Sequence, residues 1–192
     1  METMRAFIAV DIGDGIRANL DALGRKFKKV HANVRWVKPQ AIHLTLAFLG
    51  DVPADRIEPL KAALALACRD VAAFALEAQG CGTFGRPNHP RVVWAGIADC
   101  PSLARLQGRI AQRLRDAGFE VDGKPFSPHL TLGRVKETDR HTAPLLEKIE
   151  KAKALPLGAT RIESVELIHS RLTPRGAEYT VLHRVGLQEG SG

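Results

Sequence analysis

The sequence has few cysteines, and none of them are spaced as a pair. Its 192 residues contain only Cys68, Cys81 and Cys100, without a C-x-x-C motif, which excludes a framework of several disulfides. Long apolar runs are also absent: the first, at residues 5–10, is too short for a signal peptide, and no later run could span a membrane. We therefore expect a cytoplasmic protein that is neither exported by its own signal nor anchored to a membrane.

Acidic residues are outnumbered by basic ones. Lys and Arg total 28 against 21 for Asp and Glu, a formal net charge of +7, so the surface favours polyanions and nucleic acid is the natural class of partner. Hydrophobic residues make up 45% and charged residues 26%, as in globular proteins. Because no low-complexity linker divides the chain, we expect residues 1–192 to form one folding unit with a mobile tail at 188–192.

The hydrophobic periodicity predicts alternating strands and helices. Strands are expected at residues 5–10, 34–37, 42–48, 74–79, 91–97, 129–134, 161–169 and 178–185. Helices are expected at about 14–29, with Asp14 as the cap, and at 55–72, 103–114 and 143–153. The second half repeats the outline of the first, which indicates an α+β fold with mainly antiparallel sheets in two lobes.

The tetrapeptide H-L-T-L occurs once in each half, starting at His43 and at His129. Because side chains alternate faces along a strand, His43 and Thr45 point one way and the leucines beside them the other. His129 and Thr131 share a face in the same manner. If the two strands face each other across a cleft, two imidazoles and two hydroxyls line one pocket.

This set of side chains suits attack on a phosphodiester without a metal. One neutral imidazole can take a proton from water while the other, protonated, donates one to the leaving alkoxide, since both forms of histidine are available near neutral pH. Histidines on opposite sides of phosphorus favour an in-line displacement. The hydroxyls of Thr45 and Thr131 can hydrogen-bond the non-bridging oxygens, whose charge grows in the transition state.

Arg134 is a further candidate for binding phosphate, because its planar guanidinium matches phosphate oxygens. It lies five residues after His129, so a regular strand would place the two side chains on opposite faces. A bulge or a strand end at Gly133 would re-aim Arg134 toward the site. Whether Arg134 belongs to the site therefore depends on how the chain turns at Gly133.

Each motif also has a simpler interpretation. A single His-x-Thr on a strand is usually a polar pair on a half-exposed face, and only the duplication argues for catalysis. A zinc site is disfavoured because carboxylates and cysteines do not fall at suitable spacings near either histidine. Residues 80–85 satisfy G-x-G-x-x-G, but residues 86–90 contain two prolines and cannot begin the helix that a dinucleotide site needs, so we expect a glycine-rich loop between strands.

Further segments surround the two H-x-T-x motifs. They are Met4–Ala9, Arg35–Pro39, Phe48–Gly50, Pro90–Trp94, Phe126–Arg134, and Ser170–Leu172 with Gly176 and Tyr179. Together these residues resemble the 2H phosphoesterase superfamily, and most closely its bacterial and archaeal RNA 2',3'-cyclic phosphodiesterases, also called 2'-5' RNA ligases. The resemblance implies a bilobal, pseudo-two-fold fold with one motif per lobe, helices packed outside and a basic central cleft.

The resemblance also implies an activity. The expected reaction is hydrolysis of a terminal RNA 2',3'-cyclic phosphate to a 2'-phosphomonoester, without a metal or other cofactor. His43 would donate a proton to the leaving 3'-oxygen, and His129 would accept one from water. The reverse reaction, with an RNA 5'-hydroxyl in place of water, would join RNA ends by a 2',5' linkage. RNA ends, including those of tRNA fragments, are the expected partners of a monomer that requires no protein partner.

Aromatic and basic residues outside the motifs could extend the contact with RNA. Trp36 and Phe84 are candidates for stacking a terminal base, whereas Trp94 lies within a hydrophobic strand and is expected in the core. The sequence leaves open which arginines face the cleft. The candidates are Arg5, Arg35, Arg91, Arg171 and Arg175.

Two alternatives to this activity stay open. The chain could be an RNA- or nucleotide-binding module that performs no chemistry, although such a module is expected to have lost a motif histidine or threonine, and none is missing. It could also be a phosphodiesterase that acts on 2',5'-oligonucleotides or on small cyclic nucleotides.

Overall fold

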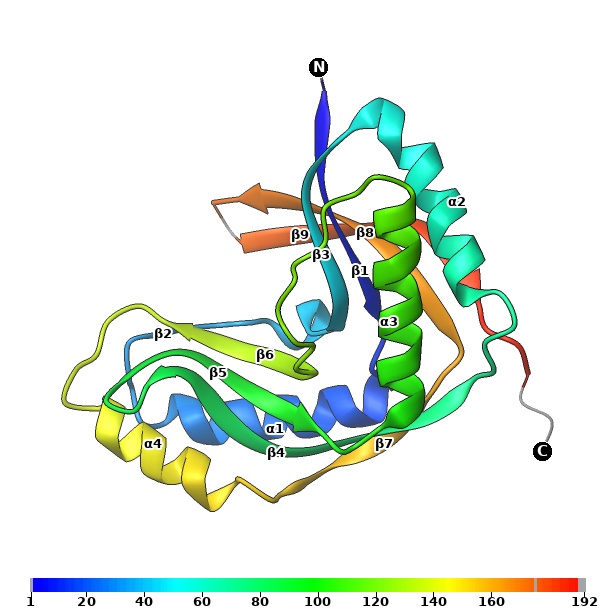
Figure 1. Ribbon diagram of the computed structural model, residues 1–192. Helices are drawn as coiled ribbons and strands as arrows, with labels where there is room; N and C mark the ends of the chain where they lie inside the picture. The colour runs from blue at the N-terminus through cyan, green and yellow to red at the C-terminus, as the bar shows by residue number, and fades with distance from the viewer. Residues whose placement is uncertain (1, 175, 190–192) are drawn as a thin grey trace.

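The computed structural model describes residues 2–174 and 176–189 (Figure 1). The strands are β1 (Thr3–Val10), β2 (Val34–Trp36), β3 (Leu44–Pro53), β4 (Phe74–Arg86), β5 (His89–Ile97), β6 (His129–Val135), β7 (Pro156–Ile162), β8 (Ser164–Thr173) and β9 (Gly176–Gly186). The helices are α1 (Gly13–Lys28), α2 (Ile57–Cys68), α3 (Pro101–Asp116) and α4 (Thr142–Lys151), with 3-10 helices η1 (Pro39–Ala41) and η2 (Ala54–Arg56). Within the described part of the chain, no helix is long and apolar enough to cross a membrane.

The strands form two sheets. Sheet A has the order β3-β1-β8-β9, and sheet B has the order β2-β6-β5-β4-β7. Neighbouring strands pair antiparallel throughout both sheets as described. The predicted α+β class with mainly antiparallel sheets is therefore confirmed.

Each half of the chain contributes strands to both sheets. In the first half, β1 and β3 pair in sheet A, but β4 lies in sheet B beside β5. In the second half, β5 and β6 pair in sheet B, but β8 lies in sheet A beside β1. The orders β3-β1-β8-β9 and β6-β5-β4-β7 correspond strand for strand, with β2 added at one edge. Neither sheet is complete without both halves.

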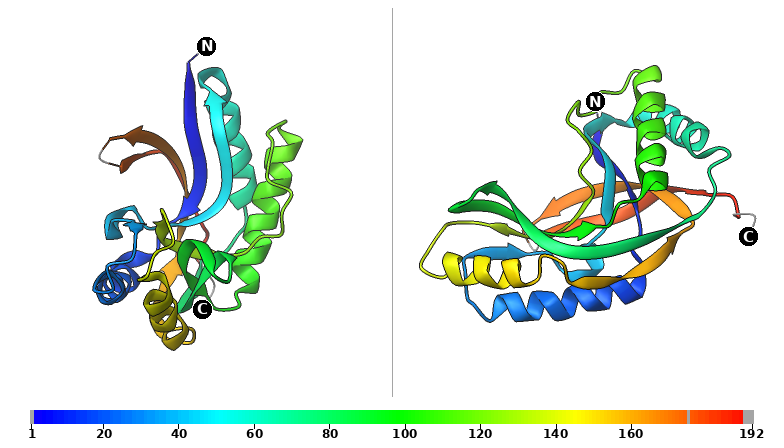
Figure 2. Two further views of the ribbon diagram at one scale, coloured as in Figure 1. Left: turned by 90° about the vertical axis from the view of Figure 1, so that its left-hand side faces the viewer. Right: turned by 60° about the horizontal axis from the view of Figure 1, so that its bottom comes forward.

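The helices pack on the outer faces of the sheets (Figure 2). Helix α1 follows a strand of sheet A but packs against sheet B through a buried stripe at helical spacing, formed by Ile16, Leu20, Leu23 and Phe27. Helix α4 lies beside it on the same side of sheet B. Helices α2 and α3 pack against each other next to sheet A. The side chains of the motif histidines and threonines project from the faces of the sheets that the helices do not cover.

The start of α1 differs from the prediction. The helix begins at Gly13, its N-cap is Ile12, and no side chain caps it. Asp14 lies inside the first turn, where its charge suits the helix dipole. The Asp11 carboxylate, one residue before the N-cap, accepts a hydrogen bond from the Gly13 N–H at 3.2 Å. The expectation that Asp14 caps the helix was therefore wrong.

Two strands differ in extent from the prediction. Residues 161–169 do not form one strand, because β7 ends at Ile162 and β8 begins at Ser164. The apolar pattern continues through this break and hides it. The strand expected at 42–48 starts two residues later and continues to Pro53.

The C-terminal segment is held at Gln188. Its N–H donates to the Val71 carbonyl at 2.8 Å, and its side-chain amide donates to the Asp70 carboxylate at 3.1 Å. Gln188, the first residue of the tail predicted to be mobile, is therefore tied to the segment after α2, while residues 190–192 lie outside the described residues.

The glycine-rich stretch at residues 80–85 is part of a strand and not the loop that we expected. Strand β4 includes all six residues. Gly82 pairs with Trp94 of β5, and a Cβ atom at Gly82 would lie 2.3 Å from the Trp94 ring. The missing side chain at Gly82 therefore makes room for the indole.

We predict that Gly82→Ala lowers the free energy of unfolding by about 1–3 kcal/mol, because the new methyl group would overlap the Trp94 ring. Urea unfolding followed by tryptophan fluorescence measures this change. The matched control is Gly108→Ala in α3, where a Cβ meets no atom within 4 Å. This substitution should stabilise the helix by about 0.5–1 kcal/mol. Equal stability of Gly82→Ala and the unmutated protein would contradict the close packing described here.

Candidate active site

The two H-L-T-L motifs lie in different sheets. His43 immediately precedes β3 of sheet A, and His129 is the first residue of β6 in sheet B. The four motif leucines are at most 3% exposed, whereas the histidines and threonines are only partly buried. The leucines thus anchor each motif in the core and leave the polar side chains on the opposite face.

Both motifs end in a β-bulge. The ladder between β1 and β3 skips Leu46, and the ladder between β5 and β6 skips Leu132. The carbonyl groups of these residues find other partners: Leu46 accepts from the Gln107 side chain at 3.3 Å, and Leu132 accepts from the Val37 N–H at 2.8 Å. Each bulge is therefore stabilised by a hydrogen bond from a neighbouring element.

The second bulge places Arg134 on the face of His129. The β6–β5 partners are His129 with Gly96, Thr131 with Trp94, and Arg134 with Val92. These β5 residues are two apart and share a face, so their partners on β6 share it too. The residue that the ladder skips is Leu132, one position before the glycine that the sequence indicated.

The His43 ring is held between two aromatic side chains of sheet A. It stacks on Phe7, with ring centroids 4.5 Å apart and an interplanar angle of 23°. The Tyr179 ring contacts it edge-on at 5.1 Å and 88°. Phe7 belongs to a small buried cluster with Ala9 and Ile168, so the orientation of His43 rests on packed side chains.

Burial changes the acidity of His43. Desolvation lowers its pKa to about 4, although a hydrogen bond to the Ala41 backbone and the charge of Asp11 act in the opposite direction. In the free protein His43 is therefore a neutral imidazole at physiological pH.

His129 has one ring nitrogen fixed by the backbone. Its Nδ1 lies 2.8 Å from the Ser127 carbonyl oxygen, which can only accept, so Nδ1 carries the hydrogen. In the neutral ring this leaves Nε2 as a proton acceptor. The Phe84 ring contacts the imidazole edge-on, with centroids 4.8 Å apart.

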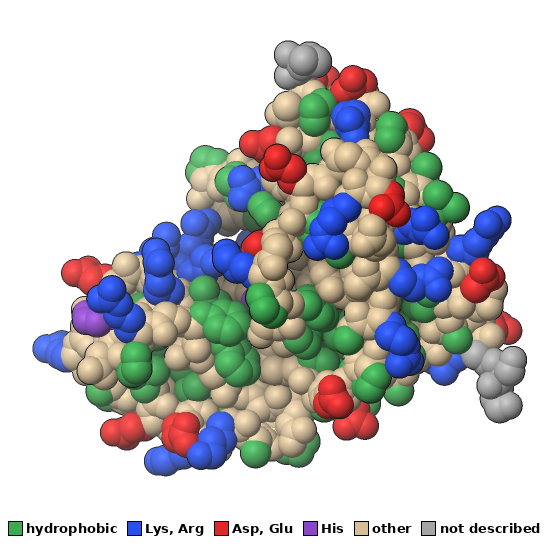
Figure 3. Space-filling model, in the orientation of Figure 1, with side chains coloured by type: hydrophobic (Ala, Val, Ile, Leu, Met, Phe, Trp, Pro, Cys, Tyr) green, Lys and Arg blue, Asp and Glu red, His purple; other side chains and the backbone are tan. Residues whose placement is uncertain are grey.

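Tyr179 of β9 links the two sheets. Its ring touches His43 of sheet A. Burial raises the pKa of its hydroxyl, and the positive charge of Arg134 from sheet B opposes that rise, which places Arg134 within electrostatic reach. The space-filling view shows the surface hollowed between the two sheets, with Lys and Arg side chains gathered along it (Figure 3). The chain therefore brings His43 and Tyr179 of sheet A within electrostatic reach of Arg134 of sheet B.

Phe84 and Trp94 lie on the His129 face of sheet B. Phe84 touches both His129 and, with centroids 5.5 Å apart, Trp94. The register gives Trp94 the same face as Thr131, so its expected place in the core was wrong. Its indole Nε1 is buried without a hydrogen-bond partner among the described residues.

The structure does not bring Trp36 into this site. Trp36 pairs with Gly133, on the face of sheet B opposite His129. Its ring packs near Phe27 of α1, with centroids 6.3 Å apart. The expectation that Trp36 stacks a terminal base is therefore contradicted, because a helix covers that face.

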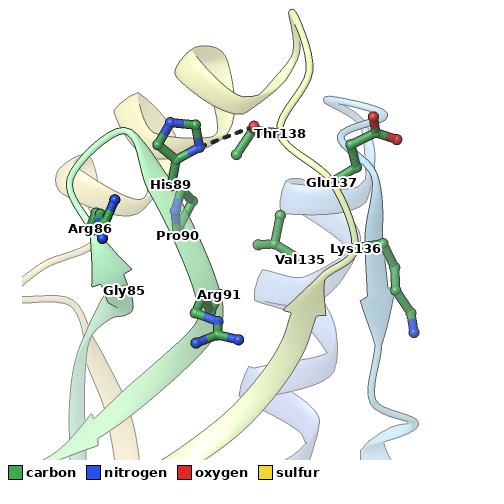
Figure 4. A pocket seen from close by; sticks show the side chains of 9 residues that line it. All are labelled: Gly85, Arg86, His89, Pro90, Arg91, Val135, Lys136, Glu137 and Thr138. Atoms are coloured by element: carbon green, nitrogen blue, oxygen red, sulfur yellow. Dashed lines mark hydrogen bonds between the residues drawn. The ribbon is translucent and has the colours of Figure 1, made fainter.

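A cavity of about 650 Å³ lies at the other end of sheet B (Figure 4). It opens between the β4–β5 hairpin and the segment after β6, where Thr138 hydrogen-bonds His89 at 3.3 Å. Arg86, Arg91 and Lys136 line it. Neither motif histidine does, so this cavity is separate from the candidate active site. Within residues 2–174 and 176–189, no three His, Cys, Asp or Glu side chains are grouped to hold a metal.

Phe7 and Tyr179 were named from the sequence only within the segments that resemble the superfamily, and their contacts with His43 were not predicted. Phe7 lies in a continuous apolar run, where no alternation distinguishes the face that it shares with His43. Tyr179 is the only tyrosine of the chain, but its contact with His43 arises from pairing of β8 with β9 and of β8 with β1. Neither contact has a signal in local sequence.

Comparison with known proteins decides the family. The family model described as 2'-5' RNA ligase superfamily matches residues 17–173. The chain belongs to this superfamily. The resemblance inferred from the paired motifs is thereby confirmed.

Similarity to superfamily members extends over nearly the whole chain. A Methanothermobacter thermautotrophicus protein named RNA 2',3'-cyclic phosphodiesterase is 33% identical over 92% of this chain and 95% of its own. The protein of that name from Archaeoglobus fulgidus is 33% identical over 92% and 96%. Among solved structures, TT0787 of Thermus thermophilus has a TM-score of 0.82 at 28% identity, covering 97% of this chain and 99% of its own. E. coli LigT complexed with 3'-AMP has a TM-score of 0.79 at 26% identity, covering 98% and 100%.

We predict that the His43 ring protons titrate with a midpoint near pH 4 in the free protein, measured by NMR. Adding inorganic phosphate should raise the midpoint, because an anion beside the ring favours the imidazolium. Tyr179→Ala should also raise it toward the ordinary value of about 6.5, because the ring becomes more solvated. A midpoint near 6.5 in the unmutated free protein would show that burial does not control this histidine.

Proposed function

We propose that this superfamily member is a metal-independent RNA 2',3'-cyclic phosphodiesterase that yields a 2'-phosphomonoester. The observation that carries the proposal is one intact H-L-T-L motif in each sheet, with Tyr179 in contact with His43 and within electrostatic reach of Arg134. The names of the curated relatives support the reaction. The structures of E. coli LigT complexed with 3'-AMP and with phosphate support a nucleotide phosphate as the ligand.

In the proposed mechanism His129 acts as the base. Its Nδ1 is engaged by the Ser127 carbonyl, so the neutral ring offers Nε2 to a water molecule. As the water oxygen bonds to phosphorus, its proton moves to His129. The bond from phosphorus to the 3'-oxygen breaks, and the departing oxygen takes a proton from His43. The 2'-oxygen keeps the phosphate.

His43 must gain a proton before it can act as the acid. With a pKa of about 4 it is neutral in the free protein, but the negative charge of a bound phosphodiester would raise that pKa. Substrate binding and proton uptake are therefore coupled in this mechanism. The acid is charged when a phosphate is in place.

Thr45, Thr131 and Arg134 bind the reacting phosphate in this proposal. They share faces with the motif histidines, and their donors suit non-bridging oxygens. Phe84, which contacts His129, is the remaining candidate for stacking the terminal base. The same residues could run the reaction backward, with an RNA 5'-hydroxyl replacing water, to form a 2',5' linkage. We further propose that the protein is a cytoplasmic monomer and that its substrates are RNA ends, including those of tRNA fragments.

An RNA that ends in a 2',3'-cyclic phosphate should be converted to the 2'-phosphate alone, even in EDTA. His43→Ala and His129→Ala should each lower kcat by roughly 100- to 10,000-fold, the usual contribution of an acid or base. His31→Asn is the matched control, since His31 is exposed with φ +61°, a conformation that Asn accepts. Product analysis by chromatography and unfolding curves of each variant complete the measurement.

The alternatives give different results in the same assay. A 3'-phosphate product or complete dependence on a divalent ion would contradict the mechanism. Nucleotide binding that survives His43→Ala, with no turnover of any cyclic phosphate by the unmutated protein, would indicate a binding module. Preferential cleavage of 2',5'-oligonucleotides or free cyclic nucleotides would identify a related phosphodiesterase.

A further inference from the structure

Two arginines lie directly opposite each other on neighbouring strands beside the site. Arg35 of β2 pairs with Arg134 of β6. Directly paired residues project to the same face of a sheet, so Arg35 lies on the face that carries Thr131 and His129. Both arginines are exposed.

Neither arginine has a carboxylate partner in the described part of the chain. Three other arginines in the sheets do: the ion pairs are Arg161 with Glu163, Arg171 with Glu178, and Arg184 with Glu166. Arg5, Arg86 and Arg91 also lack such a partner among the described residues, but the strand register does not set any of these three opposite another arginine. Like charges directly opposite on adjacent strands are destabilising. An arrangement that keeps two such cations unpaired on the His129 face suits an anionic ligand that neutralises both.

Arg35 reaches toward the other sheet. A Cβ atom at Gly176, in the turn of the β8–β9 hairpin, would lie 3.9 Å from the Arg35 Nη2 atom. Leu172 is on this hairpin and pairs with Ala177 next to that turn. Its side chain is 70% exposed, more than that of any other large hydrophobic residue described. A cation and an apolar side chain therefore approach the same end of the hollow from opposite walls.

The exposed apolar residues of sheet A share the face of His43. Ile168 pairs with Phe7, which stacks on His43, and Leu172 lies four residues along β8 on the same face. Phe48, Tyr179 and Val181 are paired to residues of this face and are also exposed. One wall of the hollow is thus apolar, and the wall across from it carries the arginine pair.

We propose that the site has a second subsite for the nucleotide that precedes the cyclic end. Arg35 binds the phosphodiester of that nucleotide, and Leu172 packs against its base. Arg35 is on the edge strand β2, one strand farther out than Arg134, so the two arginines serve successive phosphates. Unstacked bases bind apolar and aromatic faces while cations follow the backbone. This inference rests on the proposed function and makes an RNA strand, rather than a mononucleotide, the preferred substrate.

Three substrates test the subsite: adenosine 2',3'-cyclic phosphate, the dinucleotide ApA with the same cyclic end, and that dinucleotide with an uncharged methylphosphonate linkage. For the unmutated protein, kcat/KM should be highest for the natural dinucleotide. Arg35→Ala should lower kcat/KM roughly tenfold for this substrate only, as expected for one charge-assisted hydrogen bond. Its dependence on salt should also weaken, by a slope of about 0.7 in log kcat/KM against log salt concentration.

Leu172→Ala should lower kcat/KM for both dinucleotides and leave the mononucleotide unchanged, because its contact is with the base. Arg171→Ala is the matched control: it is the neighbour of Leu172 on the opposite face of the same strand, and it pairs with Glu178. This variant should keep the substrate preference of the unmutated protein. Urea midpoints of all three variants should stay within the range of surface substitutions.

The outcomes separate this inference from the proposed function. An equal loss for all three substrates in Arg35→Ala would assign Arg35 to the reacting phosphate and overturn the subsite. No loss for any substrate would overturn it as well. If the unmutated protein hydrolyses none of the three, the proposed function itself fails.

Discussion

The site depends on the antiparallel pairing of β1 with β8 and of β5 with β4. Through these pairings each half of the chain places a strand in the other half's sheet. The two motif histidines lie in different sheets, far apart in the sequence, and the backbone ladders set how the sheets stand to each other. The in-line transfer that we propose requires a fixed separation between the acid and the base. The interlocked strands supply that rigidity without a linker between domains.

The same tetrapeptide meets two different environments. In sheet A, His43 stacks on Phe7 and loses water, which lowers its pKa to about 4. In sheet B, His129 donates to the Ser127 carbonyl and touches Phe84 edge-on. Repeated sequence therefore does not produce repeated chemistry, since the surrounding strands come from different parts of the chain. In the proposed mechanism, the different roles of the two histidines follow from these neighbours, and a bound phosphate would let His43 act as an acid by raising its pKa.

Local patterns predicted the features that depend on alternation and spacing. The faces of the H-L-T-L residues and the turn in direction before Arg134 follow from the period of a strand, and α1 follows from its apolar spacing. Features that depend on which strands become neighbours were missed. Trp36 and Trp94 are both tryptophans in short apolar segments, yet one faces a helix and the other faces the site. The glycine-rich sequence around Gly82 was interpreted as a loop. Glycine is needed there because the Trp94 indole, which lies on another strand, occupies the space of a side chain.

The bulges at Leu46 and Leu132 make the parity of motif spacing meaningful. On an unbroken strand an odd interval always separates faces, so an arginine five positions after a histidine would point at the helices. One skipped residue makes that odd interval equivalent to an even one. Deleting a residue at the bulge would turn the Arg134 side chain to the opposite face of the sheet. In sheet A the same interval after His43 ends at Phe48. The two motifs thus present equivalent positions to the site, and these are occupied by an aromatic residue, Phe48, in sheet A and by a cation, Arg134, in sheet B.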